Sequence, residues 1–139
     1  MSIEIDHLGI AVRSLEEGLR FYGPLAGVEN CRRETVAAER VQVAMLPAGE
    51  ARIELLEAMD NESTIARFIE KRGPGLHHVA MRVSDLKSTL ARLRQEGARL
   101  LNEPRVGAGG HRYVFVHPES TGGVLLELIE MEGSGKRVE

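Results

Sequence analysis

Several features are scarce in this sequence, and each scarcity excludes something. Cys31 is the sole cysteine, so an intramolecular disulfide and a cysteine-rich zinc site are both impossible. No apolar stretch approaches the roughly 20 residues that a membrane helix requires, and the N-terminus lacks the basic and apolar segments of a signal peptide. We therefore expect a cytoplasmic protein with no membrane partner.

A large excess of one sign of charge is also missing. The net charge is −3, so there is no global basic field to attract nucleic acid, and we expect no nucleic-acid partner. Of the 139 residues, 42% are hydrophobic and 28% are charged, which is typical of a globular chain. This length suits one compact domain, or two small modules that share a core.

The sequence does contain a repeat. The segment "IDHLGIAV" near the N-terminus returns as "LHHVAMRV" in the second half, and superposing the two places His7 on His78. The later segments "IELLE" and "LELIE" also match, which places Glu54 on Glu127. Self-similarity of this kind indicates two copies of one module. Each copy carries a histidine near its start and a glutamate near its end.

Hydrophobic alternation and helix signals predict the same order, β-α-β-β-β, for both halves. In the first half, Ser14 with Glu17 is a capping-box signature for a helix, which we expect Gly23 and Pro24 to end. In the second half, Asp85 is the expected cap of a helix at 86–96. The other periodic segments are predicted strands: 3–12, 28–36, 41–46, 51–57, 76–83, 98–104, 111–116 and 123–130.

The predicted domain organisation follows from these elements. Module 1 covers residues 1–58, a helical linker covers 59–74, module 2 covers 75–130, and a tail without apolar pattern covers 131–139. A glycine-rich loop, "GAGG" at 107–110, interrupts module 2. We therefore predict an α+β protein built from two tandem βαβββ modules.

The two histidines and two glutamates are candidate metal ligands. Side chains alternate between the faces of a strand, so His7 points away from Leu8 and Ile10, which face the module's packing side. A carboxylate flanked by apolar residues is unfavourable to bury unless a metal ion, a hydrogen-bond network or a proton compensates it. Two imidazoles and two carboxylates suit a divalent transition metal ion and leave two of six positions for a bidentate substrate. Polar surface or a hydrogen-bonded core is the alternative.

These paired modules, with ligands on first and last strands, resemble the vicinal oxygen chelate superfamily (glyoxalase, bleomycin resistance proteins and dioxygenases). Within it, the chain is similar to the methylmalonyl-CoA epimerase family over roughly residues 3–130. The most specific segments are "RIELLEAMDNESTIARFIEKRGPGLHHVAMRV" and "LNEPRVGAGGHRYVFVHPESTGGVLLELIE". The resemblance implies a sheet that curls around a metal cleft, a homodimer, and interconversion of (R)- and (S)-methylmalonyl-CoA through C2 proton abstraction and a metal-stabilised enolate.

By position, the resemblance places metal ligands at His7, Glu54, His78 and Glu127. Glu54 is the least conventional of the four, because some relatives have glutamine there. Cobalt, manganese, nickel, zinc and iron all tolerate such ligands. Because inversion needs proton removal on one face and delivery on the other, we expect Glu127 and Glu54 also to be the catalytic acid–base pair.

Two further residues are predicted to contact substrate. At least one epimerase has a glutamate, proposed as a catalytic base, where Gln42 aligns; an amide cannot do that work, so we expect Gln42 to act through substrate or a bound water. His111 alternates with Tyr113 and Phe115 beside the glycine-rich loop and is the second. The implied partner is an acyl-CoA, although the sequence does not choose which basic residues hold its phosphates.

Other functions remain open on the same residues. A glyoxalase I-type lactoylglutathione lyase is favoured by the pair Glu54 and Glu127, since that enzyme's metal site also carries two histidines and two glutamates. A module that binds a small molecule without catalysis would use the same fold. An iron-dependent ring-cleaving dioxygenase would use two histidines and one carboxylate.

Overall fold

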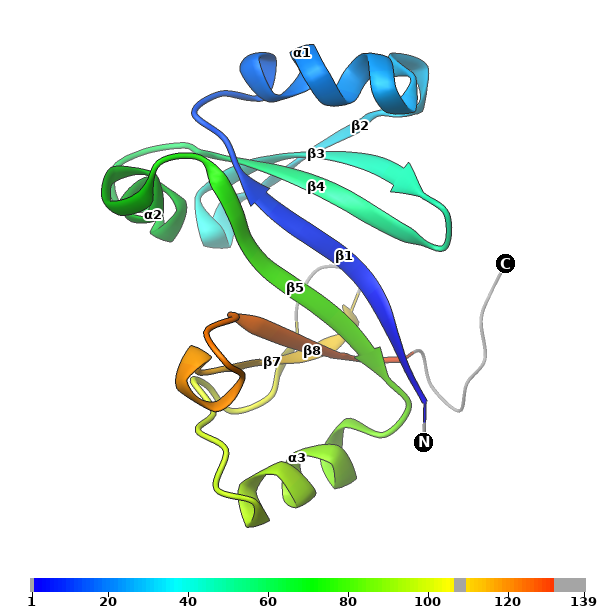
Figure 1. The fold of residues 1–139 in the computed structure, drawn as a ribbon, viewed down its shortest axis with the longest axis vertical. Helices are drawn as coiled ribbons and strands as arrows, with labels where there is room; N and C mark the ends of the chain where they lie inside the picture. The colour runs from blue at the N-terminus through cyan, green and yellow to red at the C-terminus, as the bar shows by residue number, and fades with distance from the viewer. Residues whose placement is uncertain (1, 107–109, 132–139) are drawn as a thin grey trace. The chain divides into compact units, whose positions relative to one another are not determined.

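The computed structural model describes residues 2–106 and 110–131 (Figure 1). Residues 132–139 of the predicted tail, and residues 107–109 of the predicted glycine-rich loop, lie outside the described residues. The chain divides into two compact units, which we call the first-half unit (residues 7–77) and the second-half unit (residues 1–6 and 78–139). The two boundaries lie immediately before His7 and immediately before His78, the histidines of the repeat. Each unit is described by itself.

The first-half unit is a sheet with one helix on each face. Its strands follow the order β2-β3-β4-β1, with β1 parallel to β4 and the other pairs antiparallel. Two short 3₁₀ turns, Val28–Asn30 and Ala37–Glu39, flank β2. The elements are β1 (Ile3–Ala11, of which residues 3–6 belong to the second-half unit), α1 (Leu15–Ala26), β2 (Arg32–Val36), β3 (Val41–Ala48), β4 (Ala51–Ala58) and α2 (Thr64–Arg72).

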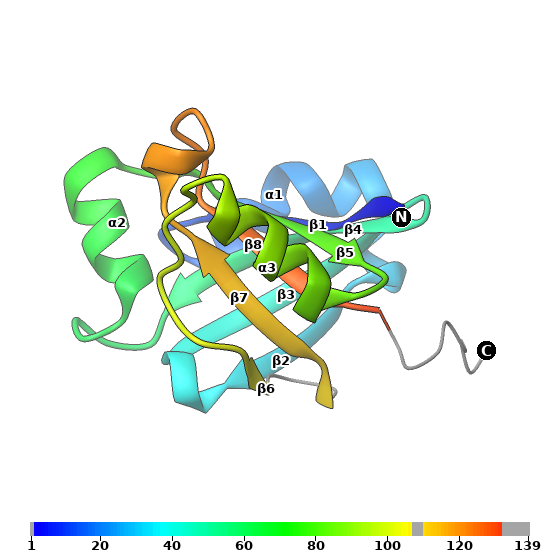
Figure 2. The same cartoon turned by 90° about the horizontal axis from the view of Figure 1, so that it is seen from below.

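Strand alternation decides which helix each face of this sheet contacts. Leu15 of α1 packs against Ala44, Leu46 and Leu55 in one buried cluster. Ile65 of α2 packs in a separate cluster on the other face, with Ala11, Val41, Val43 and Leu56. Figure 2 shows the two helices apart from each other. The predicted separation of His7 from Leu8 and Ile10 is confirmed, because His7 shares the α2 face with Ala11 while Ile10 packs on the α1 face.

The prediction that Gly23 and Pro24 end the first helix is wrong. The predicted cap is confirmed, since Ser14 accepts the Glu17 N–H at 3.1 Å, but α1 continues through Pro24 to Ala26. Proline removes one helical donor, yet the last turn is held by the Gly27 N–H, which donates to the Gly23 carbonyl at 2.7 Å. The helix ends at Gly27, whose φ of 90° favours glycine.

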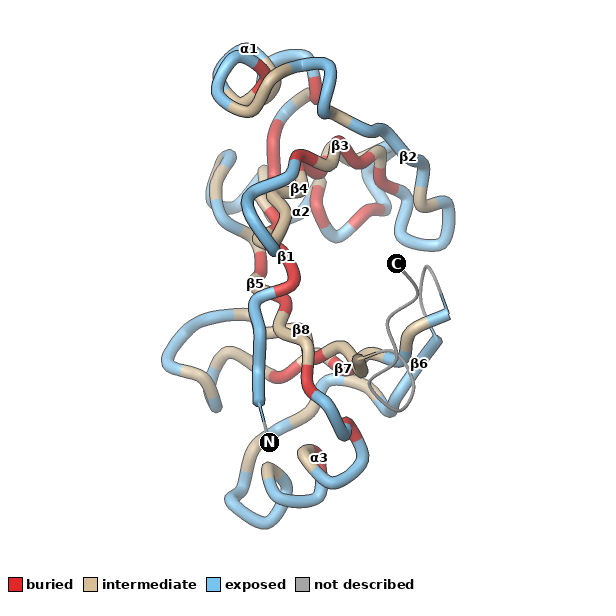
Figure 3. The backbone as a smooth tube through the Cα atoms, turned by 90° about the vertical axis from the view of Figure 1, so that its right-hand side faces the viewer, coloured by how far each residue is buried: buried red, intermediate tan, exposed pale blue. Residues whose placement is uncertain are grey.

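The second-half unit repeats this architecture with one helix. Its strand order is β5-β8-β7-β6, with β5 parallel to β8, which matches β1-β4-β3-β2 of the first half. Asp85 caps α3 by accepting the Ser88 N–H at 3.1 Å, as predicted. Figure 3 shows most of the buried stretches on strands, whereas α3 is exposed over most of its length. The elements are β5 (Gly75–Val83), α3 (Leu86–Gln95), β6 (Arg105–Val106), β7 (Arg112–Val116) and β8 (Leu126–Glu130).

The core of this unit lies between α3 and one face of its sheet. Leu86 and Leu90 of α3 pack against residues from three strands: Val83, Val114, Val116 and Leu128. The opposite face of the same strands therefore carries His78, Phe115 and Glu127. The helix covers one face and leaves the other to these three side chains.

The predicted strand at 98–104 is wrong in most of its length. Only an isolated bridge pairs Leu100 with Val116, and the short strand β6 begins later, at Arg105. Asn102 explains the gap, because its side chain takes the place of a backbone ladder: its Oδ1 accepts the Phe115 N–H at 2.9 Å. A side-chain amide that substitutes for backbone bonds interrupts strand geometry while satisfying the same donors.

The fold class is confirmed: the chain is α+β, and the eight strands of its described residues form two βαβββ modules with the same connectivity. Helix α2 lies within the segment predicted as a helical linker. Of the helices in the described ranges, none has the length and apolar character to cross a membrane.

Candidate metal centre

His7 and Glu54 form the first of two histidine–glutamate pairs. His7, on β1, is only 6% exposed, and the parallel register with β4 places Arg52 beside His7 and Glu54 beside Gly9. The Nδ1 atom of His7 lies 3.6 Å from Oε2 of Glu54. Parallel pairing of the module's first and last strands therefore brings together residues that are 47 positions apart.

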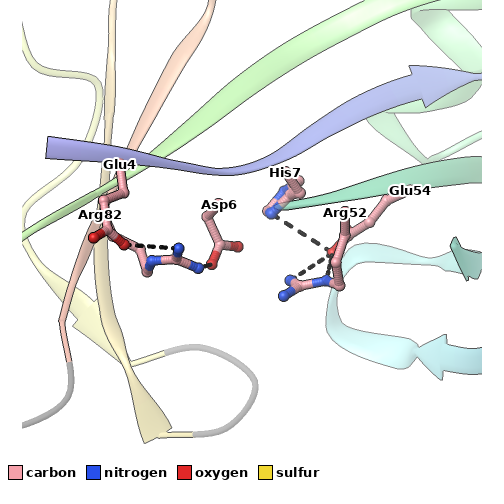
Figure 4. A network of polar contacts seen from close by, with 6 residues as sticks. All are labelled: Glu4, Asp6, His7, Arg52, Glu54 and Arg82. Carbon is pink, nitrogen blue, oxygen red and sulfur yellow. Dashed lines mark hydrogen bonds and ion pairs between the residues drawn. The ribbon is translucent and has the colours of Figure 1, made fainter. Parts of the chain in front are cut away.

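Arg52 makes a second ion pair with the same carboxylate. Its Nη2 and Nε both donate to Oε2 of Glu54, at 2.9 and 3.3 Å. Figure 4 shows the side chains of His7 and Arg52 both directed toward Glu54. The Glu54 side chain is 13% exposed, whereas that of Arg52 is 40% exposed. The carboxylate is thus largely enclosed, while the arginine that binds it is partly exposed.

His78 and Glu127 form the corresponding pair of the second-half unit. His78 is 7% exposed, and its Nε2 lies 3.5 Å from Oε1 of Glu127, whose side chain is 15% exposed. The register places Glu127 between Ala80 of β5 and Phe115 of β7. The Phe115 ring meets the His78 imidazole edge-on, with centroids 6.0 Å apart. This pair therefore has aromatic surroundings where the first pair has an arginine.

One group of histidine, cysteine, aspartate and glutamate side chains in the described part of the chain can hold a metal ion. It consists of His7, His78 and Glu127, whose potential ligand atoms lie within 4.8 Å of one another. Three of the four predicted ligands thus form the candidate site. Glu54 does not belong to that group, although it lies against His7.

The spacing within the His78–Glu127 pair fits two ligands of one metal ion. A nitrogen–oxygen hydrogen bond usually spans about 2.7–3.2 Å, and both pairs are longer, at 3.5 and 3.6 Å. Two donors that each bind one ion at about 2.1 Å lie roughly 3.0–3.5 Å apart. Imidazole nitrogen and carboxylate oxygen are also ordinary ligands of divalent transition metals. The donor chemistry and spacing therefore fit the predicted ion.

The structure places the two predicted substrate contacts differently. Gln42 lies on β3 between Val41 and Val43, which face α2, so its side chain lies on the α1 face, opposite to Glu54. There its Oε1 accepts a hydrogen bond from the Thr35 hydroxyl at 3.0 Å. His111 is half-buried and immediately precedes β7. Roles for both residues in substrate binding stay predictions.

Sequence reasoning missed a charged cluster on β1 and β5. Arg82 donates from Nη1 to Asp6 at 2.7 Å and from Nη2 to Glu4 at 2.9 Å (Figure 4). Burial by itself would lower the pKa of Arg82, but its hydrogen bonds to Glu4 and Asp6 raise the pKa above its ordinary value. The sequence did hold a signal for this cluster. Glu4 and Asp6 alternate in the first predicted strand, so they share a face, and the matching segment "LHHVAMRV" carries one arginine, Arg82.

His77, next to His78, belongs to the core of the first-half unit. Its ring packs edge-on against Phe68 of α2, with centroids 5.1 Å apart. Burial, assisted by the charge of Arg72, lowers the pKa of His77 below its ordinary value. The two consecutive histidines on β5 therefore point to opposite faces, so that His77 contacts Phe68 while His78 lies near Phe115 and Glu127.

Comparisons with known proteins agree with this geometry. The sequence profile described as the Glyoxalase/Bleomycin resistance protein/Dioxygenase superfamily matches residues 6–115. The uncharacterised protein YqjC of Bacillus subtilis is 38% identical over 130 residues, which are 93% of both chains. An ethylmalonyl-CoA/methylmalonyl-CoA epimerase of Cereibacter sphaeroides is 35% identical over 127 residues, 89% of this chain and 95% of that protein.

A solved structure gives the same result at the level of the fold. A methylmalonyl-CoA epimerase in complex with methylmalonyl-CoA and NH4+ superposes with a TM-score of 0.85 and 32% identity, covering 99% of this chain and 100% of the other. The profile match spans most of the chain and includes His7 and His78. Profile, duplicated fold and paired histidines all lead to one assignment: the chain belongs to the glyoxalase/bleomycin resistance protein/dioxygenase superfamily.

Proposed function

We propose that the protein is a metal-dependent methylmalonyl-CoA epimerase. The observation that carries the proposal is the group His7, His78 and Glu127, with ligand atoms within 4.8 Å, in a chain that matches such epimerases along nearly its whole length. The proposed substrate is an acyl-CoA with a carboxylate beside its thioester. Its C2 proton is acidified by the thioester carbonyl, but removing it adds negative charge next to an existing carboxylate.

The proposed ion is divalent and is held by His7, His78 and Glu127, with Glu54 as the fourth ligand. When bound, the ion supplies Lewis-acid stabilisation of the negative charge on the substrate's two oxygens. Both histidines are buried, and an imidazole nitrogen binds a divalent transition metal ion through its lone pair. Cobalt, manganese, nickel, zinc and iron(II) are all compatible with these donors.

The proposed proton transfers use the two glutamates. The Glu127 carboxylate accepts the C2 proton, and Glu54 is its counterpart for delivery to the other face of the planar enolate. Reversal of these roles returns the opposite enantiomer. Support comes from the repeat, since the two carboxylates occupy equivalent places on β4 and β8 and each lies beside a histidine. Both are largely enclosed, which limits exchange of the carried proton with solvent.

The test is exchange of the C2 proton of methylmalonyl-CoA in deuterated water, followed by NMR or mass spectrometry. We expect exchange and epimerisation that a chelator abolishes and that one or more of the five metals restores. Glu127→Gln should lower the rate of exchange by at least about 100-fold, because an amide does not accept the proton. Glu16→Gln, on the exposed surface of α1, is the matched control and should keep the wild-type rate.

Two outcomes contradict the proposal. One is the absence of C2 exchange with each of the five metals supplied in turn. The other is near-normal exchange by Glu127→Gln, which removes Glu127 as the base while leaving the reaction class intact. The two failures are separate, since the first concerns the activity and the second the residue.

A glyoxalase I-type lyase is the second candidate. It is favoured by one observation, namely that each unit supplies a carboxylate beside its histidine, so that two glutamates accompany two histidines. The assay is formation of lactoylglutathione from methylglyoxal and glutathione, measured with the same metals. Turnover there without C2 exchange of methylmalonyl-CoA selects this candidate over the epimerase.

We further propose a homodimer in the cytoplasm. The superfamily resemblance supports the dimer, and sedimentation at micromolar concentration tests it. The single cysteine, which cannot form an intramolecular disulfide, accords with a reducing compartment such as the cytoplasm, and fractionation of the source cells tests it.

A further inference from the structure

We propose that Phe115 is a positioning residue for the candidate metal centre, because its ring favours the orientation of the His78 imidazole that binds the ion. The inference rests on the proposed function and deepens it, since it adds a side chain that has no ligand atom of its own. Phe115, His78 and Glu127 all belong to the second-half unit.

The Phe115 ring contacts one of the proposed imidazole ligands. Its centroid lies 6.0 Å from that of His78, and the two ring planes cross at 85°. Aromatic rings prefer this edge-on arrangement at centroid separations of about 4.5–7 Å. Rotation of the imidazole about its χ2 angle would break the arrangement. The contact therefore favours the orientation in which Nε2 of His78 lies 3.5 Å from Oε1 of Glu127.

Backbone hydrogen bonds place the same ring beside Glu127. The Phe115 N–H donates to Oδ1 of Asn102 at 2.9 Å, and the Phe115 carbonyl accepts the Leu101 N–H at 2.8 Å. Both backbone groups thus point away from β8, which makes Phe115 and Glu127 a non-hydrogen-bonded pair of the antiparallel ladder. Side chains approach most closely in such pairs. Phe115 therefore lies beside both members of the His78–Glu127 pair.

The Phe115 ring is not part of the core under α3. Its neighbours Val114 and Val116 are buried in that core, whereas Phe115 is half-buried on the opposite face of the strand. On that face Tyr113 packs edge-on against the same ring, with centroids 5.8 Å apart. The ring is thus held by its strand and by Tyr113, and its loss leaves the contacts of the helix in place.

The repeat indicates that the fold does not require an aromatic ring at this place. Glu127 pairs with Phe115 across the ladder, whereas its repeat partner Glu54 pairs with Met45. Met45 packs against the cluster under α2, so an unbranched apolar side chain is sufficient at the equivalent place of the first-half unit. A ring at this place in the ladder therefore distinguishes the second-half unit from the first.

Orientation of His78 should matter for metal affinity. A ligand side chain that packing already orients loses less rotational freedom when an ion binds. The rival role for Phe115 is packing alone. In that case its loss should destabilise the metal-free protein without changing its affinity for metal.

The experiment compares metal affinity with the stability of the metal-free protein. Wild type, two variants without the ring (Phe115→Leu and Phe115→Met) and Phe115→Tyr are stripped by chelator. Chelator competition then gives the Kd for Zn²⁺ and Co²⁺, urea unfolding gives the stability of the metal-free form, and the visible spectrum of the Co²⁺ form reports ligand geometry.

Two control variants remove a phenylalanine ring elsewhere. Phe68→Leu is the matched control, because Phe68 also packs edge-on against a histidine, but that histidine is His77, which is not a proposed ligand. Phe21→Leu removes a ring from the exposed surface of α1.

We expect both variants without the ring to weaken metal binding by about 2- to 10-fold, the range that one edge-on aromatic pair supplies. The visible bands of their Co²⁺ forms should shift or broaden, because the imidazole no longer has one favoured orientation. Phe115→Tyr should keep the wild-type affinity and spectrum, since it keeps the ring. Phe68→Leu should lower the urea midpoint without changing metal affinity, and Phe21→Leu should change neither.

Wild-type affinity and an unchanged Co²⁺ spectrum in the variants without the ring overturn the inference. An equal loss of affinity in Phe68→Leu also overturns it, because the loss would then follow general destabilisation. If the wild type binds metal without exchanging the C2 proton of methylmalonyl-CoA, the proposed epimerase function fails, and the affinities still decide the role of Phe115. A wild type that binds none of the five metals overturns both.

Discussion

The two glutamates should differ in what they contribute to metal binding. Glu127 belongs to the group of atoms within 4.8 Å, whereas Glu54 lies outside it and already has the guanidinium of Arg52 at 2.9 Å. An ion gains less from a carboxylate whose charge is offset by a nearby cation. We therefore expect Glu127→Gln to weaken metal binding by about 100-fold and Glu54→Gln by about tenfold, the two ends of the range for perturbed metal sites.

These factors convert into measurable stability, since an ion that binds only the folded chain stabilises it by RT ln(1 + [M]/Kd). At a metal concentration 100 times the wild-type Kd, the wild type gains about 2.7 kcal/mol, Glu54→Gln about 1.4 and Glu127→Gln about 0.4. With about 2.1 cal/mol/K of unfolding entropy per residue over 139 residues, the corresponding rises in Tm are about 9, 5 and 1.5 °C.

The assay is thermal unfolding followed by circular dichroism, with each protein stripped by chelator and then measured with and without metal. Glu16→Gln, on the exposed surface of α1, should give the wild-type shift. Equal shifts for both glutamate variants would refute the asymmetry. A wild type that gains no stability from any of the five metals would refute the metal centre itself.

Three other predictions concern the scaffold around the centre. Arg82→Gln should cost about 1.5–3 kcal/mol in urea unfolding, because it removes a charged hydrogen bond to the 10%-exposed Asp6 carboxylate. Glu4→Gln, at a half-exposed carboxylate, should cost less than about 1 kcal/mol; similar losses would contradict the burial argument. Glu57→Ala should cost about 1–2 kcal/mol, since its carboxylate accepts the first N–H of α1 at 2.8 Å, and unchanged urea unfolding would contradict that cap. The Glu62 backbone N–H, together with the Arg40 guanidinium, lowers the pKa of the Asp60 carboxyl below its ordinary 3.8. The stability that this carboxylate contributes is therefore present above pH 3.8 and is lost as the pH falls through the pKa of the folded state. Asp60→Asn should flatten the acid side of a plot of unfolding free energy against pH, and an unaltered plot would count against the argument.

Much of the fold was predictable because its signals are local or repeated. Ser14 and Asp85 cap their helices as expected, since an acceptor followed by a good helix segment needs no tertiary information. The face assigned to His7 was predictable from alternation alone. The pairing of each histidine with its glutamate required a different signal, the duplication, which related first and last strands that the sequence separates widely.

The errors arose where a side chain or a tertiary contact replaced the usual backbone pattern. Pro24 was expected to end α1, but the final turn is held by a backbone bond to Gly23 that no propensity reports. The strand expected at 98–104 is interrupted because the Asn102 amide bonds β7 in place of its backbone. The role expected of Gln42 stays a prediction, and what its strand adds is the face: the side chain lies on the α1 face, where it accepts a hydrogen bond from the Thr35 hydroxyl.

Duplication also explains why the asymmetry of the centre was harder to predict than its symmetry. Two like modules supply like donors, which suits proton transfer on the two equivalent faces of a planar enolate. The proposed substrate is not symmetric, however, because its carboxylate and its thioester must be told apart if the CoA is to lie in one direction. The two halves do differ in charge beside the first histidine of the repeat, because Arg52, the register neighbour of His7, is aligned by the repeat with the apolar Leu125.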